Sequence, residues 1–153
     1  MNNIIFLDID GVLNYDYWYH SEEYANLEFD AECDIDPKCV NLINKLCEEC
    51  NASIVISSSW KINNYYKSRL ERAGLKYILD KTPDLIYLGK GNYSRGEEID
   101  LWLDLHKVDN YVIIDDVDAF TENQQPHFVK TNASVGFNEY DYNLAKNILN
   151  YVK

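Results

Sequence analysis

Short apolar runs bounded by polar or turn residues predict the strands of this protein. The clearest runs span Ile4 to Asp8, Ser53 to Ser57 and Tyr111 to Ile114, and weaker ones span Lys76 to Leu79 and His127 to Lys130. Each of the three clear runs ends on polar groups. The pattern therefore predicts about five strands.

Between these runs, apolar residues recur at helical intervals. Asp36-Pro37 is a cap followed by proline, which predicts a helix running to about Cys50. The other helices are predicted from Trp60 to Ala73, with Ser59 as cap and Gly74 as stop, from Gly96 to His106, and from Asp141 to Val152. Strands that alternate with helices predict an α/β fold, a single Rossmann-like, doubly wound parallel sheet with helices on both faces.

Polar side chains gather where the predicted strands end. In a doubly wound sheet the ligand site lies beyond the carboxyl ends of the strands. We therefore expect chemistry at Asp8 and Asp10, at Ser57-Ser58-Ser59, and at Asp115-Asp116.

Length and composition favour one globular domain over residues 1–153, because 46% of the residues are hydrophobic and 26% are charged. The formal net charge of −12 argues against non-specific affinity for nucleic acid or anionic membranes. No apolar stretch approaches the roughly 20 residues of a membrane span, and Met1-Asn2-Asn3 lacks the charged start of a secretion signal. We expect a cytoplasmic protein.

Four cysteines leave two interpretations open. Cys47-Glu48-Glu49-Cys50 could pair with Cys33 and Cys39 in a zinc site of loose spacing. Alternatively, the thiols are small hydrophobic groups on the core face of a helix, because Val40, Ile43 and Leu46 recur with them at helical intervals.

The segment from Asn14 to Asp34 combines aromatic and acidic residues without an obvious period. It could be an irregular excursion that packs its aromatic side chains on the domain. It could also be a flap over the site, since long loops are often functional.

Four motifs occur in a fixed order along the chain: Asp8-Ile9-Asp10-Gly11-Val12, Ile54-Val55-Ile56-Ser57, Arg95 ahead of Glu97-Glu98-Ile99, and Val112-Ile113-Ile114-Asp115-Asp116. With them, residues 4 to 130 resemble the phosphatases of the haloacid dehalogenase (HAD) superfamily. A finer pattern is similar to small HAD domains associated with nucleic-acid repair proteins. It consists of Ser57-Ser58-Ser59-Trp60-Lys61, Thr82-Pro83, Arg95-Gly96 with Glu98-Ile99, and Trp102-Leu103.

The resemblance implies a role for each strand-end residue. Asp8 would be the nucleophile that forms an aspartyl-phosphate, and Asp10 the general acid and base. Phosphate would be bound by Ser57, by the amides of Ser58 and Ser59, and by a cation, Arg95 or its competitor Lys90. Mg²⁺, which prefers oxygen ligands, would be held by Asp8, the carbonyl of Asp10, Asp116, and Asp115 through a water.

The intervals between these motifs are short, so the resemblance implies a domain without a large cap. Three functions remain open: a Mg²⁺-dependent phosphomonoester hydrolase of small or large phosphorylated substrates, a polynucleotide-end or nucleotide phosphatase, and a HAD-fold binding domain without turnover. A basic track would support nucleic acid, and its candidates are Lys61, Lys67, Arg69, Arg72 and Lys90. Asp118 and Glu98 are predicted to lie on the solvated surface.

Overall fold

The computed structural model describes residues 2–27, 34–85 and 93–152. The strands are β1 (Asn3–Leu7), β2 (Ala52–Ile56), β3 (Ile78–Lys81), β4 (Asn110–Asp115) and β5 (Phe128–Lys130). The α-helices are α1 (Asp16–Tyr19), α2 (Glu22–Ala25), α3 (Pro37–Cys50), α4 (Tyr66–Arg72), α5 (Arg95–Asp104) and α6 (Glu139–Leu149). The described residues also form the 3₁₀ helices η2 (Ser59–Ile62) and η3 (Glu122–His127).

All the strands pair in parallel in one sheet of order β3-β2-β1-β4-β5. The chain starts at the central strand, builds one half of the sheet, and then crosses back past β1 to build the other half. This confirms the predicted doubly wound fold. Its point of reversal lies between β1 and β4, where such sheets bind ligands.

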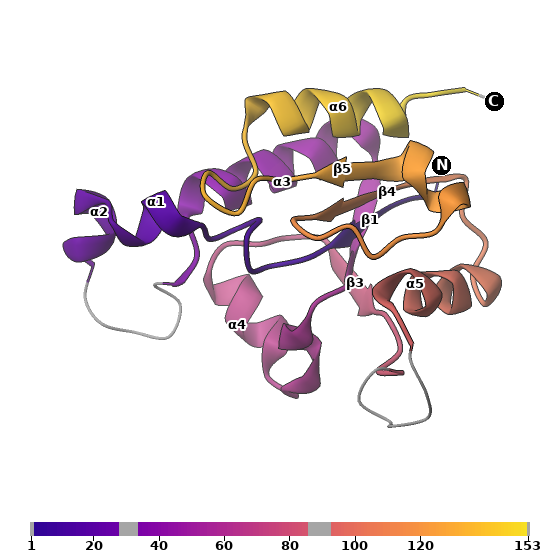
Figure 1. Cartoon of the computed structure of the whole chain (residues 1–153), viewed down its shortest axis with the longest axis horizontal. Helices are drawn as coiled ribbons and strands as arrows, with labels where there is room; N and C mark the ends of the chain where they lie inside the picture. Colours follow the sequence, from indigo (N-terminus) through magenta and orange to yellow (C-terminus); the bar gives the residue numbers. More distant parts are fainter. Residues whose placement is uncertain (1, 28–33, 86–92, 153) are drawn as a thin grey trace.

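Helices cover both faces of the sheet, with α3 and α6 on one side and α5 on the other (Figure 1). Alternate residues of β1 serve the two layers: Ile5 and Leu7 join the larger apolar cluster with α3 and α6, whereas Ile4 and Phe6 join the smaller cluster with α5. A strand buried on both faces explains the unbroken apolar run. No helix among the described residues has the length and apolar character needed to cross a membrane.

Helix α3 carries three of the four cysteines. Asp36 caps it by accepting the amide of Lys38, with Pro37 at the first helical position, as predicted. Cys39, Cys47 and Cys50 are buried in the larger apolar cluster, and burial raises the pKa of Cys39 and of Cys47 to about 12. These three thiols act as hydrophobic core residues, whereas Cys33 lies outside the described residues.

The prediction of one continuous helix from Trp60 to Ala73 is wrong. The structure has η2, a break at Asn63, and then α4. The Asn63 side chain accepts the backbone amide of Tyr65 at 2.8 Å, a local hydrogen bond that competes with a continuous helix. Ser58, not Ser59, is the cap that precedes η2.

The aromatic segment from Asn14 onward contains α1 and α2, which project beyond the body of the domain (Figure 1). Its base is attached, because the amides of Asp16 and Tyr17 donate to the carbonyls of Ala133 and Ser134, and Trp18 is buried. Residues 28–33 of the predicted flap lie outside the described residues, and gating by this segment stays a prediction.

Candidate active site

Three aspartates meet where β1 and β4 end. Asp8 directly follows β1, Asp115 is the last residue of β4, and Asp116 follows it. Because Leu7 pairs with Ile114, the two strands leave the sheet side by side. One carboxylate oxygen from each aspartate lies within 4.8 Å of the others. The parallel pairing thus builds a compact acidic cluster from residues a hundred positions apart.

Arg95 supplies positive charge to this cluster. It is the first residue of α5, whose start is fixed by a capping box between Ser94 and Glu97. Its Nη1 lies 3.1 Å from Asp8 Oδ1 and 2.8 Å from Asp115 Oδ2. Lys90, the competing candidate, lies outside the described residues.

One arginine leaves this cluster with an excess of negative charge. The pKa of Asp8 is raised to about 9, first by burial and then by the negative charge of Asp115, although Arg95 opposes the shift. Burial also raises the pKa of Asp115. Oxygen ligands with unbalanced charge at one point fit a divalent cation such as Mg²⁺, which would lower both pKa values.

Gly11 makes the close approach of Asp116 possible. Its φ angle of +83° lies in the left-handed region, and a Cβ atom at this position would lie 2.4 Å from Asp116 Oδ2. Its carbonyl accepts the hydroxyl of Thr131 at 2.9 Å, which ties the turn to the residue after β5. A glycine is therefore required at the turn of the first motif.

Asp10 is exposed, unlike Asp8, and its carboxylate is oriented by neighbours. Trp60 Nε1 lies 3.2 Å from each carboxylate oxygen, and Asn14 Nδ2 donates to Oδ1 at 2.9 Å. Asp8 and Asp10 both line a hollow of about 380 Å³, together with Ser94, Arg95, Asp116, Val117 and Ala119. The two aspartates of the first motif thus face the same space from different environments.

The serines after β2 lie beside this site. Ile56 pairs with Leu7, so Ser57 and Asp8 leave adjacent strands together. Ser57 Oγ is buried and has no hydrogen-bond partner among the described residues. Such an atom is available to a ligand. Ser58 Oγ accepts the amide of Trp60, which leaves the Ser58 backbone amide as its candidate phosphate donor.

Sequence reasoning missed a buried ion pair behind Arg95. Lys61 is 2% exposed and Glu98 is 1% exposed, and their charged atoms lie 2.9 Å apart. The prediction that Glu98 lies on the solvated surface is wrong. Glu98 shares a helix face with buried Ile99 and Trp102, a spacing that could have revealed its burial. Asp118 is exposed, as predicted, and accepts the amide of Phe120.

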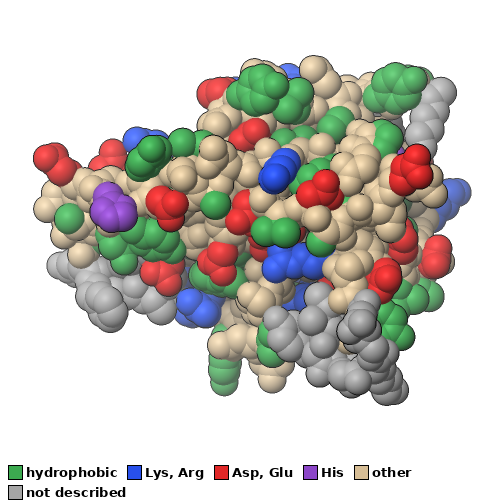
Figure 2. Space-filling model, in the orientation of Figure 1, with side chains coloured by type: hydrophobic (Ala, Val, Ile, Leu, Met, Phe, Trp, Pro, Cys, Tyr) green, Lys and Arg blue, Asp and Glu red, His purple; other side chains and the backbone are tan. Residues whose placement is uncertain are grey.

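The described residues do not form the basic track that would favour nucleic acid. Lys61 is buried, and Lys67 pairs with Glu71 at 3.9 Å. Arg69 alone of the described candidates lines a hollow beside Asp10. Figure 2 shows basic side chains placed singly among acidic ones over the visible face. Any recognition of a polyanion must therefore be local.

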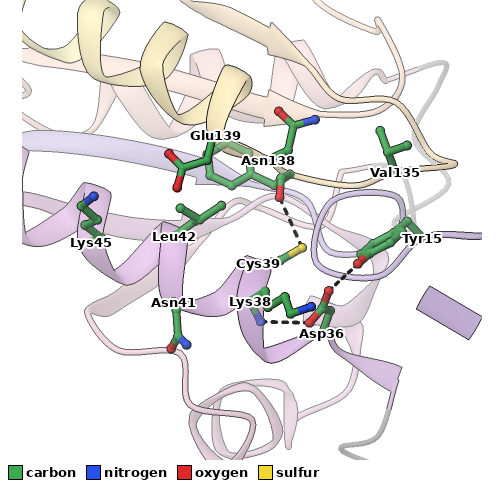
Figure 3. Close-up of a pocket in the computed structure, with 11 residues that line it drawn as sticks. Tyr15, Asp36, Lys38, Cys39, Asn41, Leu42, Lys45, Val135, Asn138 and Glu139 are labelled. Atoms are coloured by element: carbon green, nitrogen blue, oxygen red, sulfur yellow. Dashed lines mark hydrogen bonds between the residues drawn. The ribbon is translucent and has the colours of Figure 1, made fainter. Parts of the chain in front are cut away.

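A larger hollow, of about 530 Å³, lies between α3 and the loop before α6 (Figure 3). Several of its polar groups already have partners: Asp36 accepts the Tyr15 hydroxyl and the Lys38 amide, and Cys39 Sγ donates to the carbonyl of Phe137. These contacts anchor the aromatic segment to α3. We assign this hollow a structural role.

One comparison with known proteins, against models of protein families, gives a match. No curated protein and no solved structure matches the chain. Residues 4–142 match the family model described as the HAD domain in Swiss Army Knife RNA repair proteins. Since this match covers most of the sequence and both strands that carry the acidic cluster, the chain belongs to that family of HAD domains.

Proposed function

We propose that the protein is a Mg²⁺-dependent phosphomonoester hydrolase that works through an aspartyl-phosphate on Asp8. The observation that carries this proposal is the cluster of Asp8, Asp115 and Asp116 within 4.8 Å, contacted by Arg95. Family membership supports hydrolase chemistry of the HAD type. The approach of Arg95 to Asp8 and Asp115 also supports the proposal, because phosphoryl transfer needs positive charge near the nucleophile.

In the first step, a carboxylate oxygen of Asp8 forms a bond to phosphorus while the bond from phosphorus to the ester oxygen breaks. Asp10, held by Trp60 and Asn14, gives its proton to that leaving oxygen. The guanidinium of Arg95 and the hydroxyl of Ser57 stabilise the phosphoryl oxygens, with the amide of Ser58 as a further donor.

In the second step, a water oxygen forms a bond to phosphorus, and the bond between phosphorus and Asp8 breaks. Asp10 takes the proton of that water, so inorganic phosphate leaves and both aspartates return to their starting state. Asp8, the carbonyl of Asp10, Asp116 and Asp115 would hold Mg²⁺, which neutralises charge on the carboxylates and the phosphate.

The test is hydrolysis of an aryl phosphate with and without Mg²⁺. Asp8→Asn is expected to lower kcat by about 10⁴-fold, because the amide cannot attack phosphorus. Asp104→Asn makes the same chemical change at an exposed position near the other end of α5, and it should retain full activity.

Activity that survives Asp8→Asn would refute the aspartyl-phosphate. A folded wild-type protein that hydrolyses no phosphomonoester in Mg²⁺ would favour the alternative of a binding domain without turnover.

A second candidate has a narrower range of substrates. It is a polynucleotide-end phosphatase, which the RNA repair association of the family favours.

A further inference from the structure

Two hollows of the protein meet at Asp10. The hollow of about 380 Å³ that Asp8 and Arg95 line is called the reaction hollow below, and a second hollow of about 400 Å³ shares Asp10 with it. The lining of this second hollow is Asp10, Ser59, Trp60, Ile62, Asn63 and Arg69. Its volume lies within the roughly 300–1,000 Å³ of small-ligand sites.

The position of Asp10 determines what this second hollow holds. If Asp10 protonates the leaving oxygen, the group attached to that oxygen must lie beside Asp10 and away from the phosphoryl group in the reaction hollow. The second hollow shares Asp10 and extends from it toward α4. The leaving group of the reaction therefore enters the second hollow.

The side chains of this second hollow suit a flat, anionic group. Trp60 presents an indole ring, and Arg69 lies over that ring with its Cζ atom 4.5 Å from the ring centroid. Aromatic and guanidinium planes stack on nucleobases, and a guanidinium also binds phosphate. Ile62 adds an apolar wall, and Asn63 and Ser59 add polar groups for a sugar or base edge.

Exposed side chains lie in and beside the second hollow. Ile62 is 47% exposed, and Tyr65, whose amide donates to the Asn63 side chain, is 72% exposed. Helix α4, YKSRLER, carries Lys67, Arg69 and Arg72 against one glutamate, in a chain whose formal net charge is −12. This local excess of positive charge favours a substrate with further phosphates.

We propose that the Trp60–Arg69 hollow, lined by Ser59, Trp60, Ile62, Asn63 and Arg69, binds the terminal nucleotide of a phosphorylated polynucleotide. This inference rests on the proposed phosphatase function. The base stacks at Trp60 and Arg69, the terminal phosphate reaches Asp8, and the rest of the strand leaves past Tyr65 along α4.

The test compares kcat/KM of the Mg²⁺-loaded protein on 3′- and 5′-phosphorylated RNA and DNA oligonucleotides, on the matching mononucleotides, and on phenyl phosphate. At least one oligonucleotide should exceed phenyl phosphate by about tenfold or more. Mononucleotides as good as oligonucleotides would overturn the polymer assignment.

Arg69→Ala should remove about tenfold of the oligonucleotide preference, mainly through KM. Lys107→Ala removes the same charge at an exposed position beside Asn2, at the opposite end of β1 from Asp8, and should retain the preference.

Equal losses on phenyl phosphate and on the oligonucleotide would overturn the inference, as would equal losses from Lys107→Ala and Arg69→Ala. Because Arg69 Nε is buried, thermal unfolding of the Arg69 variant must be compared with wild type. Ile62→Asp is the second variant. It places a negative charge at an exposed wall of the hollow and should weaken oligonucleotide hydrolysis more than phenyl phosphate hydrolysis.

Binding separates this inference from the proposed function. Asp8→Asn should bind a labelled phosphorylated oligonucleotide more tightly than Asp8→Asn/Arg69→Ala does. Such binding without any turnover by wild type would refute the phosphatase and support the subsite. Turnover of phenyl phosphate without Arg69-dependent binding would refute the subsite alone.

Discussion

Two sets of charged side chains lie near the start of α5, and they differ in how far the protein itself neutralises their charge. Behind Arg95, Lys61 Nζ donates at 2.8–2.9 Å to Glu98 Oε1, Thr82 Oγ1 and the carbonyl of Pro83. All its ammonium protons are therefore used within the protein. Burial lowers the pKa of Lys61 despite the nearby carboxylate of Glu98, as expected for an enclosed cation.

In front of α5, Arg95 faces the cluster of Asp8, Asp115 and Asp116. Burial alone would lower the pKa of Arg95, but the charges of Asp8 and Asp115 raise it above its ordinary value. The charges of Lys61 and Glu98 neutralise each other within the protein, although Glu98 Oε2 has no hydrogen-bond partner among the described residues. The cluster that contains Asp8 still requires positive charge, and such an imbalance is typical of a ligand site.

The largest effect is expected from removing the cation that faces the cluster. Arg95→Ala should lower kcat on an aryl phosphate by about 10⁴-fold, the scale seen when an arginine leaves a phosphoryl-transfer site. Steady-state kinetics at saturating Mg²⁺ would measure the loss. Arg72→Ala, on the exposed surface of α4, is the control. A loss below about tenfold would show that another cation, such as Lys90, stabilises the phosphoryl group.

The second effect is on stability. Lys61→Met should lower the free energy of unfolding by about 3–5 kcal/mol, because it leaves Glu98 buried without its partner. The double variant Lys61→Met/Glu98→Leu removes both charges and should recover most of that loss. Denaturant titrations would give the values. Equal stability of the single and double variants would show that the unpaired charge of Glu98 does not cause the loss.

Much of the fold and part of the site could be predicted because they depend on local signals and on sheet geometry. Buried runs predicted all the strands, and parallel pairing of their carboxyl ends predicted that Asp8, Asp115 and Asp116 lie close together. The role of Arg95, with Lys90 as its competitor, came from the resemblance to HAD phosphatases. The catalytic roles of these residues stay predictions.

The contacts that could not be predicted join distant segments through packing. The Trp60 indole reaches Asp10 across 50 positions of the chain. The side-chain hydrogen bond of Asn63 favours the break between η2 and α4. Lys61 finds Glu98 across 37 positions because η2 and α5 approach each other. The helical spacing of α5 indicates that Glu98 is buried, but no local pattern in the sequence identifies Lys61 as its partner.

The unbalanced charge at Asp8 should make the stabilising effect of Mg²⁺ depend on pH. The ordinary pKa of 3.8 rises to about 9 in the folded chain, so the folded state holds a proton that the unfolded state releases. Without Mg²⁺, this contribution to stability is complete below about pH 4 and is lost as pH rises toward about 9. Mg²⁺ replaces the proton, so its stabilising effect should be small near about pH 5 and large near about pH 9.

Thermal unfolding with and without Mg²⁺ across this range would test this pH dependence. Asp8→Asn carries no titrating group at this position, so the pH dependence of its Mg²⁺ effect should be weaker. A Mg²⁺-dependent gain in Tm that is equal at both ends of the range in wild type would contradict the prediction.

The smallest effect is expected from Trp60→Phe, which keeps an aromatic ring and removes the N–H that contacts both oxygens of Asp10. Among the described residues, only Asn14 would then orient the carboxyl group of Asp10, so protonation of a poor leaving group should slow by about tenfold. Hydrolysis of para-nitrophenyl phosphate needs no such proton and should change less. Comparing kcat for this substrate and for an alkyl phosphate isolates the role of Trp60. An equal decrease on both would mean that the indole supports the fold of the site rather than the proton transfer by Asp10.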